Sequence, residues 1–111
     1  MYYTYLLRCG DGSLYAGITT DPARRLAEHR AGGEKGARYT RFRGPLVMAA
    51  LWESADRRLA TRLEYRLKKA PHAVKAALIA APGTVSAVLP GLGAGDYTPR
   101  PLPDQADAAF K

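Results

Sequence analysis

Residues 2–18, YYTYLLRCGDGSLYAGI, decide the fold of this chain. The stretches 2–8 and 14–18 are rich in aromatic and β-forming side chains, which predicts two strands. The segment Cys9–Ser13 between them has the glycines and the aspartate of a tight turn. The two strands therefore form a β-hairpin, and two of its tyrosine positions, Tyr5 and Tyr15, lie on neighbouring strands.

The length of the hairpin loop decides which side chains share a face. A two-residue turn at Asp11-Gly12 pairs position 5 with 18 and position 8 with 15, so Tyr5 and Tyr15 lie on opposite faces. A three-residue loop pairs 5 with 17 and 7 with 15, places Tyr3, Tyr5 and Tyr15 on one face, and needs a left-handed Gly12. The first register gives the more apolar face, and the sequence leaves both registers open.

The rest of the pattern predicts three helices and one more strand. The helices are expected at 22–31, 55–69 and 71–81, and the strand is expected at 46–52. Asp21 and Ser54 are the expected N-caps of the first two helices. The order β-β-α-β-α-α predicts an α+β fold with a small, mainly antiparallel, three-stranded sheet flanked by helices.

The composition changes at Pro82, because the last thirty residues hold five prolines and four glycines. We therefore expect a domain over residues 1–81 and a Pro/Gly-rich C-terminal appendage over 82–111, either draped on the domain or mobile. The longest apolar stretch, 73–89, is interrupted by a lysine, a proline and a glycine, so no transmembrane helix is expected. With no signal-peptide pattern and one cysteine, a cytoplasmic protein is expected.

The net charge indicates an acidic partner. The 111 residues include 17 Lys and Arg against 10 Asp and Glu, a formal net charge of +7 at pH 7. Nucleic acid is the first expectation and anionic lipid the second, because most of the cations are Arg, whose planar fork fits phosphate. Arg24, Arg38, Arg41 and Arg43 are the expected DNA contacts, although Arg24 is also the i, i+4 partner of Glu28.

Five further residues form the candidate catalytic set. Tyr5 and Tyr15 lie on the paired strands, Arg25 and His29 share one face of the first helix, and Glu64 is a carboxylate in an Arg-rich helix. Each has a structural alternative: the tyrosines as packed strand aromatics, His29 as a helix C-terminal residue, and Glu64 as the ion-pair partner of a lysine four residues later. The sequence contains no Walker loop, GxSxG, HExxH or CxxC motif.

At these positions the sequence resembles the GIY-YIG nuclease superfamily, most closely its small bacterial single-domain members. The stretch 15–17, YAG, matches the second half-motif, and 3–5, YTY, keeps the last tyrosine of the first. Arg25 lies eight residues after the motif glycine, His29 follows four residues later, and Glu64 lies in a downstream helix, as the family pattern has them. The resemblance covers about the first eighty residues.

The resemblance implies hydrolysis of DNA phosphodiester bonds with one divalent metal, Mg²⁺ or Mn²⁺. It implies Glu64 as the metal ligand and Arg25 on the phosphate oxygens, with Tyr5, Tyr15 or His29 as the general base. Which of the three is the base stays open at this point. We expect an endonuclease with little sequence specificity, and family analogy adds structure-selective action in DNA repair or recombination.

Two features differ from the family pattern. The first half-motif lacks its Gly and Ile, and the chain contains no asparagine, whereas many members carry a late Asn in the active site. These differences favour an alternative, a non-catalytic nucleic-acid-binding module of the same fold. A third hypothesis is a protein-interaction domain whose working part is the C-terminal segment. Convergence of the five candidate residues on one cleft favours the nuclease.

Overall fold

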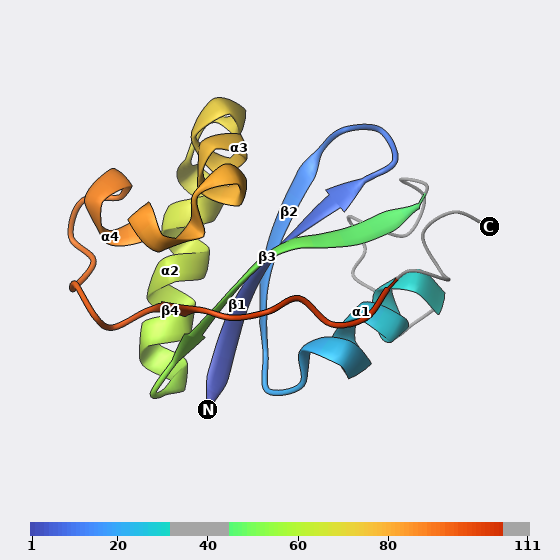
Figure 1. Ribbon diagram of the computed structural model, residues 1–111, viewed down its shortest axis with the longest axis horizontal. Coiled ribbons are helices and arrows are strands. Elements are labelled where there is room, and N and C mark those ends of the chain that lie inside the picture. Colours follow the sequence, from blue (N-terminus) through green and yellow to red (C-terminus); the bar gives the residue numbers. More distant parts are fainter. Residues whose placement is uncertain (32–44, 106–111) are drawn as a thin grey trace.

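A computed structural model describes residues 1–31 and 45–105 of the chain (Figure 1). Its sheet is antiparallel, with the strand order β2-β1-β3-β4. The strands are β1 (Tyr2–Cys9), β2 (Leu14–Thr19), β3 (Leu46–Ser54) and β4 (Thr98–Pro99). The predicted α+β fold is confirmed, and the fourth strand is a short one that the C-terminal segment adds to the edge of β3.

The hairpin adopts the register that places the tyrosines on one face. Tyr5 pairs with Gly17 and Leu7 pairs with Tyr15 across β1 and β2. Gly12 has a φ of 87°, the left-handed conformation that closes a three-residue loop. The other register, with its more apolar face, is therefore not the one formed.

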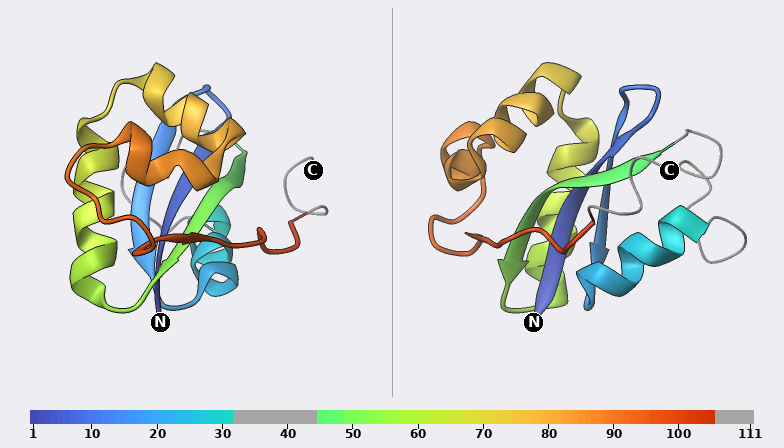
Figure 2. Two further views of the ribbon diagram at one scale, coloured as in Figure 1. Left: turned by 60° about the vertical axis from the view of Figure 1, so that its left-hand side comes forward. Right: turned by 45° about the vertical axis from the view of Figure 1, so that its right-hand side comes forward.

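Helices cover both faces of the sheet (Figures 1 and 2). They are α1 (Pro22–Ala31), α2 (Arg57–Lys69), α3 (His72–Ala80) and α4 (Val85–Val88), with a short 3-10 helix, η1 (Pro82–Thr84), before α4. The first helix lies on one face, and α2, α3 and α4 lie on the other. Within residues 1–31 and 45–105, no helix has both the length and the apolar character needed to cross a bilayer.

The helix caps follow the sequence in one case and differ from it in the other. Asp21 caps α1 as predicted, since its Oδ1 accepts a backbone N–H three residues later at 3.1 Å. The predicted cap of α2 at Ser54 is wrong: the cap is Asp56, whose Oδ1 accepts from Leu59 N at 2.9 Å. Ser54 is instead the last residue of β3, because the strand continues beyond its apolar run to pair with Tyr2.

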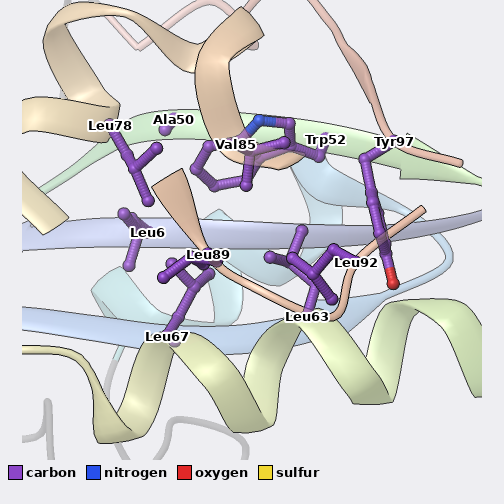
Figure 3. Close-up of a cluster of buried hydrophobic side chains, with 11 residues drawn as sticks. Leu6, Ala50, Trp52, Leu63, Leu67, Leu78, Val85, Leu89, Leu92 and Tyr97 are labelled. Carbon is purple, nitrogen blue, oxygen red and sulfur yellow. The ribbon is translucent and has the colours of Figure 1, made fainter. Parts of the chain in front are cut away.

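Two apolar clusters lie on either side of the sheet. The larger one, under α2, α3 and α4, comprises Leu6, Ala16, Ala50, Trp52, Leu63, Leu67, Leu78, Val85, Leu89, Leu92 and Tyr97 (Figure 3). The smaller one, under α1, comprises Tyr5, Leu7, Leu26, Met48 and Leu51. Trp52 is fully buried, and its Nε1–H donates to Pro82 O at 2.9 Å.

A β-bulge explains why the apolar run in β3 is continuous. Neighbouring residues of β1 pair with Ala50 and Met48, which leaves Ala49 as an extra residue. The bulge reverses the alternation of the strand, so Met48 and Leu51 both lie in the cluster under α1. With Ala50 and Trp52 in the larger cluster, both faces of β3 are covered.

The C-terminal segment packs on the rest of the molecule up to residue 105. Four of its side chains are buried in the larger cluster: Val85, Leu89, Leu92 and Tyr97. The Tyr97 hydroxyl donates to Leu59 O at 2.8 Å, and the Gln105 amide makes two hydrogen bonds of 2.8 Å with the backbone of Met48. The division between residues 81 and 82 stays a prediction.

Candidate active site

A buried tyrosine–histidine pair forms the centre of the site. Tyr5 of β1 is 1% exposed and His29 of α1 is 2% exposed. The Tyr5 hydroxyl lies 2.8 Å from His29 Nε2, and the two rings meet edge-on with centroids 5.8 Å apart. This hydrogen bond links α1 to the sheet inside an otherwise apolar cluster.

The glycine of the YAG motif makes room for the tyrosine. Gly17 of β2 is the strand partner of Tyr5. A Cβ at Gly17 would lie 2.5 Å from Tyr5 Cζ, closer than any side chain tolerates. The Tyr5 ring therefore lies against the bare backbone of β2. Position 17 needs glycine because of this close packing, and not because of a turn.

Tyr15 extends the centre of the site toward solvent. Its ring is edge-on to His29, with centroids 5.6 Å apart, so the histidine lies between two tyrosines. The Lys68 ammonium of α2 lies 5.8 Å from the Tyr15 ring centroid on another side. Of the two tyrosines and the histidine, only Tyr15 is partly exposed.

Arg25 is held at the edge of this centre. Its Nη1 lies 3.1 Å from Glu28 Oε1, so Glu28 pairs with Arg25 and not with Arg24 as the i, i+4 spacing suggested. Burial lowers the pKa of Arg25, but contacts with Tyr5 and Glu28 outweigh it and raise the pKa above its usual value. Arg25 therefore keeps its positive charge beside the tyrosine.

Burial sets the charge state of the central pair. It raises the pKa of Tyr5 to about 12, although hydrogen bonding to Arg25 lowers it in part. Burial, followed by the positive charge of Arg25, lowers the pKa of His29 to about 4. Tyr5 and His29 are therefore both neutral at pH 7.

Glu64 approaches the site from the other side of the sheet. It lies on α2, its side chain is 21% exposed, and Lys68 Nζ lies 3.4 Å from its Oε2, which confirms the expected i, i+4 pair. Its charge adds to burial in raising the pKa of Tyr5. Because β2 is an edge strand and α2 packs against β1 and β2, the site extends across this edge. Tyr5, Tyr15, Arg25 and His29 are thus joined by direct contacts, and Glu64 is connected to Tyr5 through its charge.

Two open hollows lie along β2, one at each end. The first, about 300 Å³, is lined by Tyr2, Ile18, Thr19, Thr20, Arg24, Arg25 and Arg57. The second, about 400 Å³, is lined by Leu14, Tyr15, Ala16, Lys68 and Lys75. A third, about 330 Å³, lies between the start of α1 and the C-terminal segment and is lined by none of the five candidate residues.

The predicted DNA contacts have two different outcomes. Arg24 is exposed and lines the first hollow beside Arg25. Arg38, Arg41 and Arg43 lie outside the described residues.

Sequence reasoning missed three cations beside β2. They are Arg57, Lys68 and Lys75. The i, i+4 spacing indicated Lys68 only as a partner of Glu64. No local signal indicated the other two, because their position depends on how α2 and α3 pack against the sheet.

Residues 1–75 match the GIY-YIG catalytic domain family. The chain belongs to the GIY-YIG family. The resemblance expected from the sequence is confirmed, and membership places this GIY-YIG domain in a nuclease family with DNA as the indicated partner.

This GIY-YIG domain is also similar to several UPF0213 proteins. One from Nitratidesulfovibrio vulgaris is 43% identical over 83 residues, which cover 75% of this chain and 74% of the relative. Another from Serratia proteamaculans is 47% identical over 81 residues, covering 73% and 78%. The solution NMR structure of a UPF0213 protein from Bacillus halodurans is 42% identical, covers 72% of this chain and 84% of that one, and gives a TM-score of 0.46.

Proposed function

We propose that this GIY-YIG protein is a metal-dependent endonuclease that hydrolyses DNA phosphodiester bonds with little sequence specificity. The observation that carries the proposal is the clustering of an arginine, two tyrosines and a histidine beside β2, with a carboxylate on the neighbouring helix α2 whose charge acts on Tyr5. These residues are Tyr5, Tyr15, Arg25, His29 and Glu64, and they come from four separate elements. A cytoplasmic location and a structure-selective role in repair or recombination belong to the same proposal.

Arg25 is the residue that binds the phosphate. Its side chain is 25% exposed, so a guanidinium edge reaches solvent while Glu28 holds the rest. The raised pKa keeps it cationic, and a guanidinium bound to phosphate stabilises the charge that builds up during hydrolysis.

Tyr15 is the residue that contacts the attacking water. Tyr5 and His29 are 1% and 2% exposed, so their polar atoms do not reach bulk solvent. With pKa values of about 12 and about 4, neither carries charge near neutral pH. Their part is to position Tyr15 through the ring contact between His29 and Tyr15. Of the three candidates for the general base, we therefore assign the contact with water to Tyr15 and the positioning of Tyr15 to Tyr5 and His29.

The donor set fits a metal that the protein holds together with its substrate. Within residues 1–31 and 45–105, no group of three or more His, Cys, Asp or Glu side chains is arranged to hold a metal ion. Mg²⁺ retains most of its waters and is commonly held by one or two carboxylates plus substrate phosphate. Glu64 would supply that carboxylate, and bound Mg²⁺ or Mn²⁺ would neutralise phosphate charge. We therefore expect metal binding that depends on DNA.

The test is cleavage of a labelled DNA panel with Mg²⁺ or Mn²⁺. The panel contains duplex, single-stranded, flap and four-way-junction substrates. Glu64→Gln and Arg25→Ala are each expected to lower the cleavage rate about 100-fold or more, the usual effect of removing one group that stabilises the transition state. EDTA is expected to abolish cleavage.

Matched controls separate the site from general charge. Glu53 is shielded much like Glu64, with 23% against 21% side-chain exposure, but it pairs with Arg100 at the sheet edge opposite β2. Glu53→Gln and Arg62→Ala are expected to cleave within about twofold of the parent. Cleavage that survives in both Glu64→Gln and Arg25→Ala would contradict the site assignment.

The second candidate is a non-catalytic nucleic-acid-binding module. The burial of Tyr5 and His29 is the observation that favours it, because neither side chain reaches bulk water. Salt-sensitive DNA binding without cleavage on any substrate, in either metal, would support this candidate over the endonuclease.

A further inference from the structure

Strand β2 is the open edge of the sheet, and positive charge lies at both of its ends. The opposite edge, at β3, is covered: Arg100 N donates to Leu51 O at 2.9 Å, and Gln105 pairs with the backbone of Met48. No strand of residues 1–31 or 45–105 pairs with the outer side of β2. A bound polyanion therefore has one sheet edge that it can follow.

The cations at the two ends come from three different helices. Arg24 and Arg57 line the hollow beside Thr19, and Lys68 and Lys75 line the hollow beside Leu14. They belong to α1, α2 and α3. The fold thus gathers on one edge cations that no sequence run would have grouped.

The carboxylates near this edge are already paired. Glu28 pairs with Arg25, and Glu64 pairs with Lys68. Lys68 is 51% exposed, so its ammonium can turn from Glu64 to a phosphate without leaving the edge. The lining of each hollow contains cations and no carboxylate, and the candidate active site lies between the two hollows.

We propose that the β2 edge is a track for the phosphate backbone of one DNA strand. Arg24 and Arg57 hold phosphates on one side of the bond to be cleaved, and Lys68 and Lys75 hold phosphates on the other. This inference rests on the proposed function for the position of that bond. It adds Arg57, Lys68 and Lys75 as binding residues.

The length of the track sets its expected footprint. Leu14 and Thr20 are six residues apart, which in an extended strand is about 20 Å. One strand of B-form DNA advances about 3.4 Å per nucleotide, so the track spans about six nucleotides.

The test measures DNA binding in EDTA, with Glu64→Gln as the parent so that no cleavage occurs. Fluorescence anisotropy is recorded on a single strand and on a duplex over a range of salt concentrations. Each phosphate contact contributes about 0.7 (single strand) to 0.9 (duplex) to the slope of log affinity against log salt. Arg57→Ala and Lys75→Ala are each expected to reduce the slope by about that amount and to weaken binding several-fold.

Two control variants remove the same charge elsewhere. The charge of Arg62 acts on Tyr97 of the C-terminal segment, Lys69 lies 4.9 Å from the ring centroid of the exposed Tyr65, and neither cation lines either hollow. Arg62→Ala and Lys69→Ala are expected to leave the slope unchanged. Equal losses in the control and track variants, or none in Arg57→Ala and Lys75→Ala, would overturn the track.

The outcome is separable from that of the proposed function. Slopes that fall as expected, together with no cleavage by the wild-type protein, would keep the track and reject the endonuclease. Cleavage by the wild type, with salt slopes that do not change in Arg57→Ala and Lys75→Ala, would keep the endonuclease and reject the track. Binding of anionic phospholipid vesicles that is lost in Arg57→Ala and Lys75→Ala, with DNA binding intact, would overturn the track and assign the edge to a membrane surface.

Discussion

His29 is the residue whose protonation is most strongly tied to the folded state. Its pKa is about 4 in the folded chain, because the ring is buried and faces Arg25, and about 6.5 in an unfolded one. Between these values the unfolded chain binds the extra proton, so stability falls as pH falls. The contribution is fully present above pH 6.5 and is lost by about pH 4. From pH 7 to pH 5.5 we expect a loss of about 1 kcal/mol.

Urea unfolding at pH 7 and pH 5.5 measures this dependence. His29→Gln keeps an amide that can bond Tyr5 and has no proton to gain, so its unfolding free energy is expected to change about 1 kcal/mol less over the same interval. An NMR titration of the His29 ring with a midpoint near 6.5 would contradict the buried, neutral state.

The positions of the site residues could be predicted from the sequence, but their chemical states could not. Spacing and the YAG motif indicated Tyr5, Tyr15, Arg25, His29 and Glu64. Which ring reaches solvent depends on packing: α1 covers Tyr5, buries its own His29 against the sheet and leaves Tyr15 partly open. No pattern in the sequence carries that information.

At the scale of elements, the capping of α2 gives a direct test. Asp56 Oδ1 accepts a backbone N–H at 2.9 Å, whereas the Ser54 hydroxyl makes one long bond of 3.4 Å to a strand carbonyl. Asp56→Ala is expected to lower the free energy of unfolding by about 1 kcal/mol, and Ser54→Ala by clearly less. Chemical denaturation of both variants measures the difference. A larger loss in Ser54→Ala would restore the cap predicted from the sequence.

Local elements could be predicted, and non-local pairing could not. The helices predicted at 22–31 and 55–69 follow from apolar periodicity and breakers within a few residues, although the second begins two residues later than predicted. The bulge at Ala49 and the short strand β4 depend on residues about forty to fifty positions away in the chain. The hairpin register depends on both local and non-local features. The loop sequence allows two lengths, and packing of Tyr5 on Gly17 selects one of them.

At the scale of the whole molecule, the C-terminal segment is expected to unfold together with the sheet. Leu92 is 7% exposed in the larger apolar cluster, so Leu92→Ala is expected to cost about 2–5 kcal/mol. Leu102 is 43% exposed, and Leu102→Ala is expected to change stability by no more than about 0.5 kcal/mol. Urea unfolding followed by circular dichroism measures both. Equal, small effects would instead favour a separate appendage.

The Pro/Gly content of residues 82–111 did not indicate this packing. Proline and glycine restrict local backbone conformation, and they do not report where Val85, Leu89 or Leu92 are buried. Those contacts form only once α2 and α3 have provided a surface, which is a property of the assembled fold.

The open edge of β2 has a consequence for the behaviour of the protein in solution. An unpaired edge strand is a template on which a second copy can add its own strand, the first step of many aggregates. Here Arg57, Lys68 and Lys75 surround that edge, so two copies approaching edge to edge repel one another. The positive charge that attracts a polyanion thus also opposes self-association of the protein. Salt, which screens it, should bring copies together, and light scattering against ionic strength would record this.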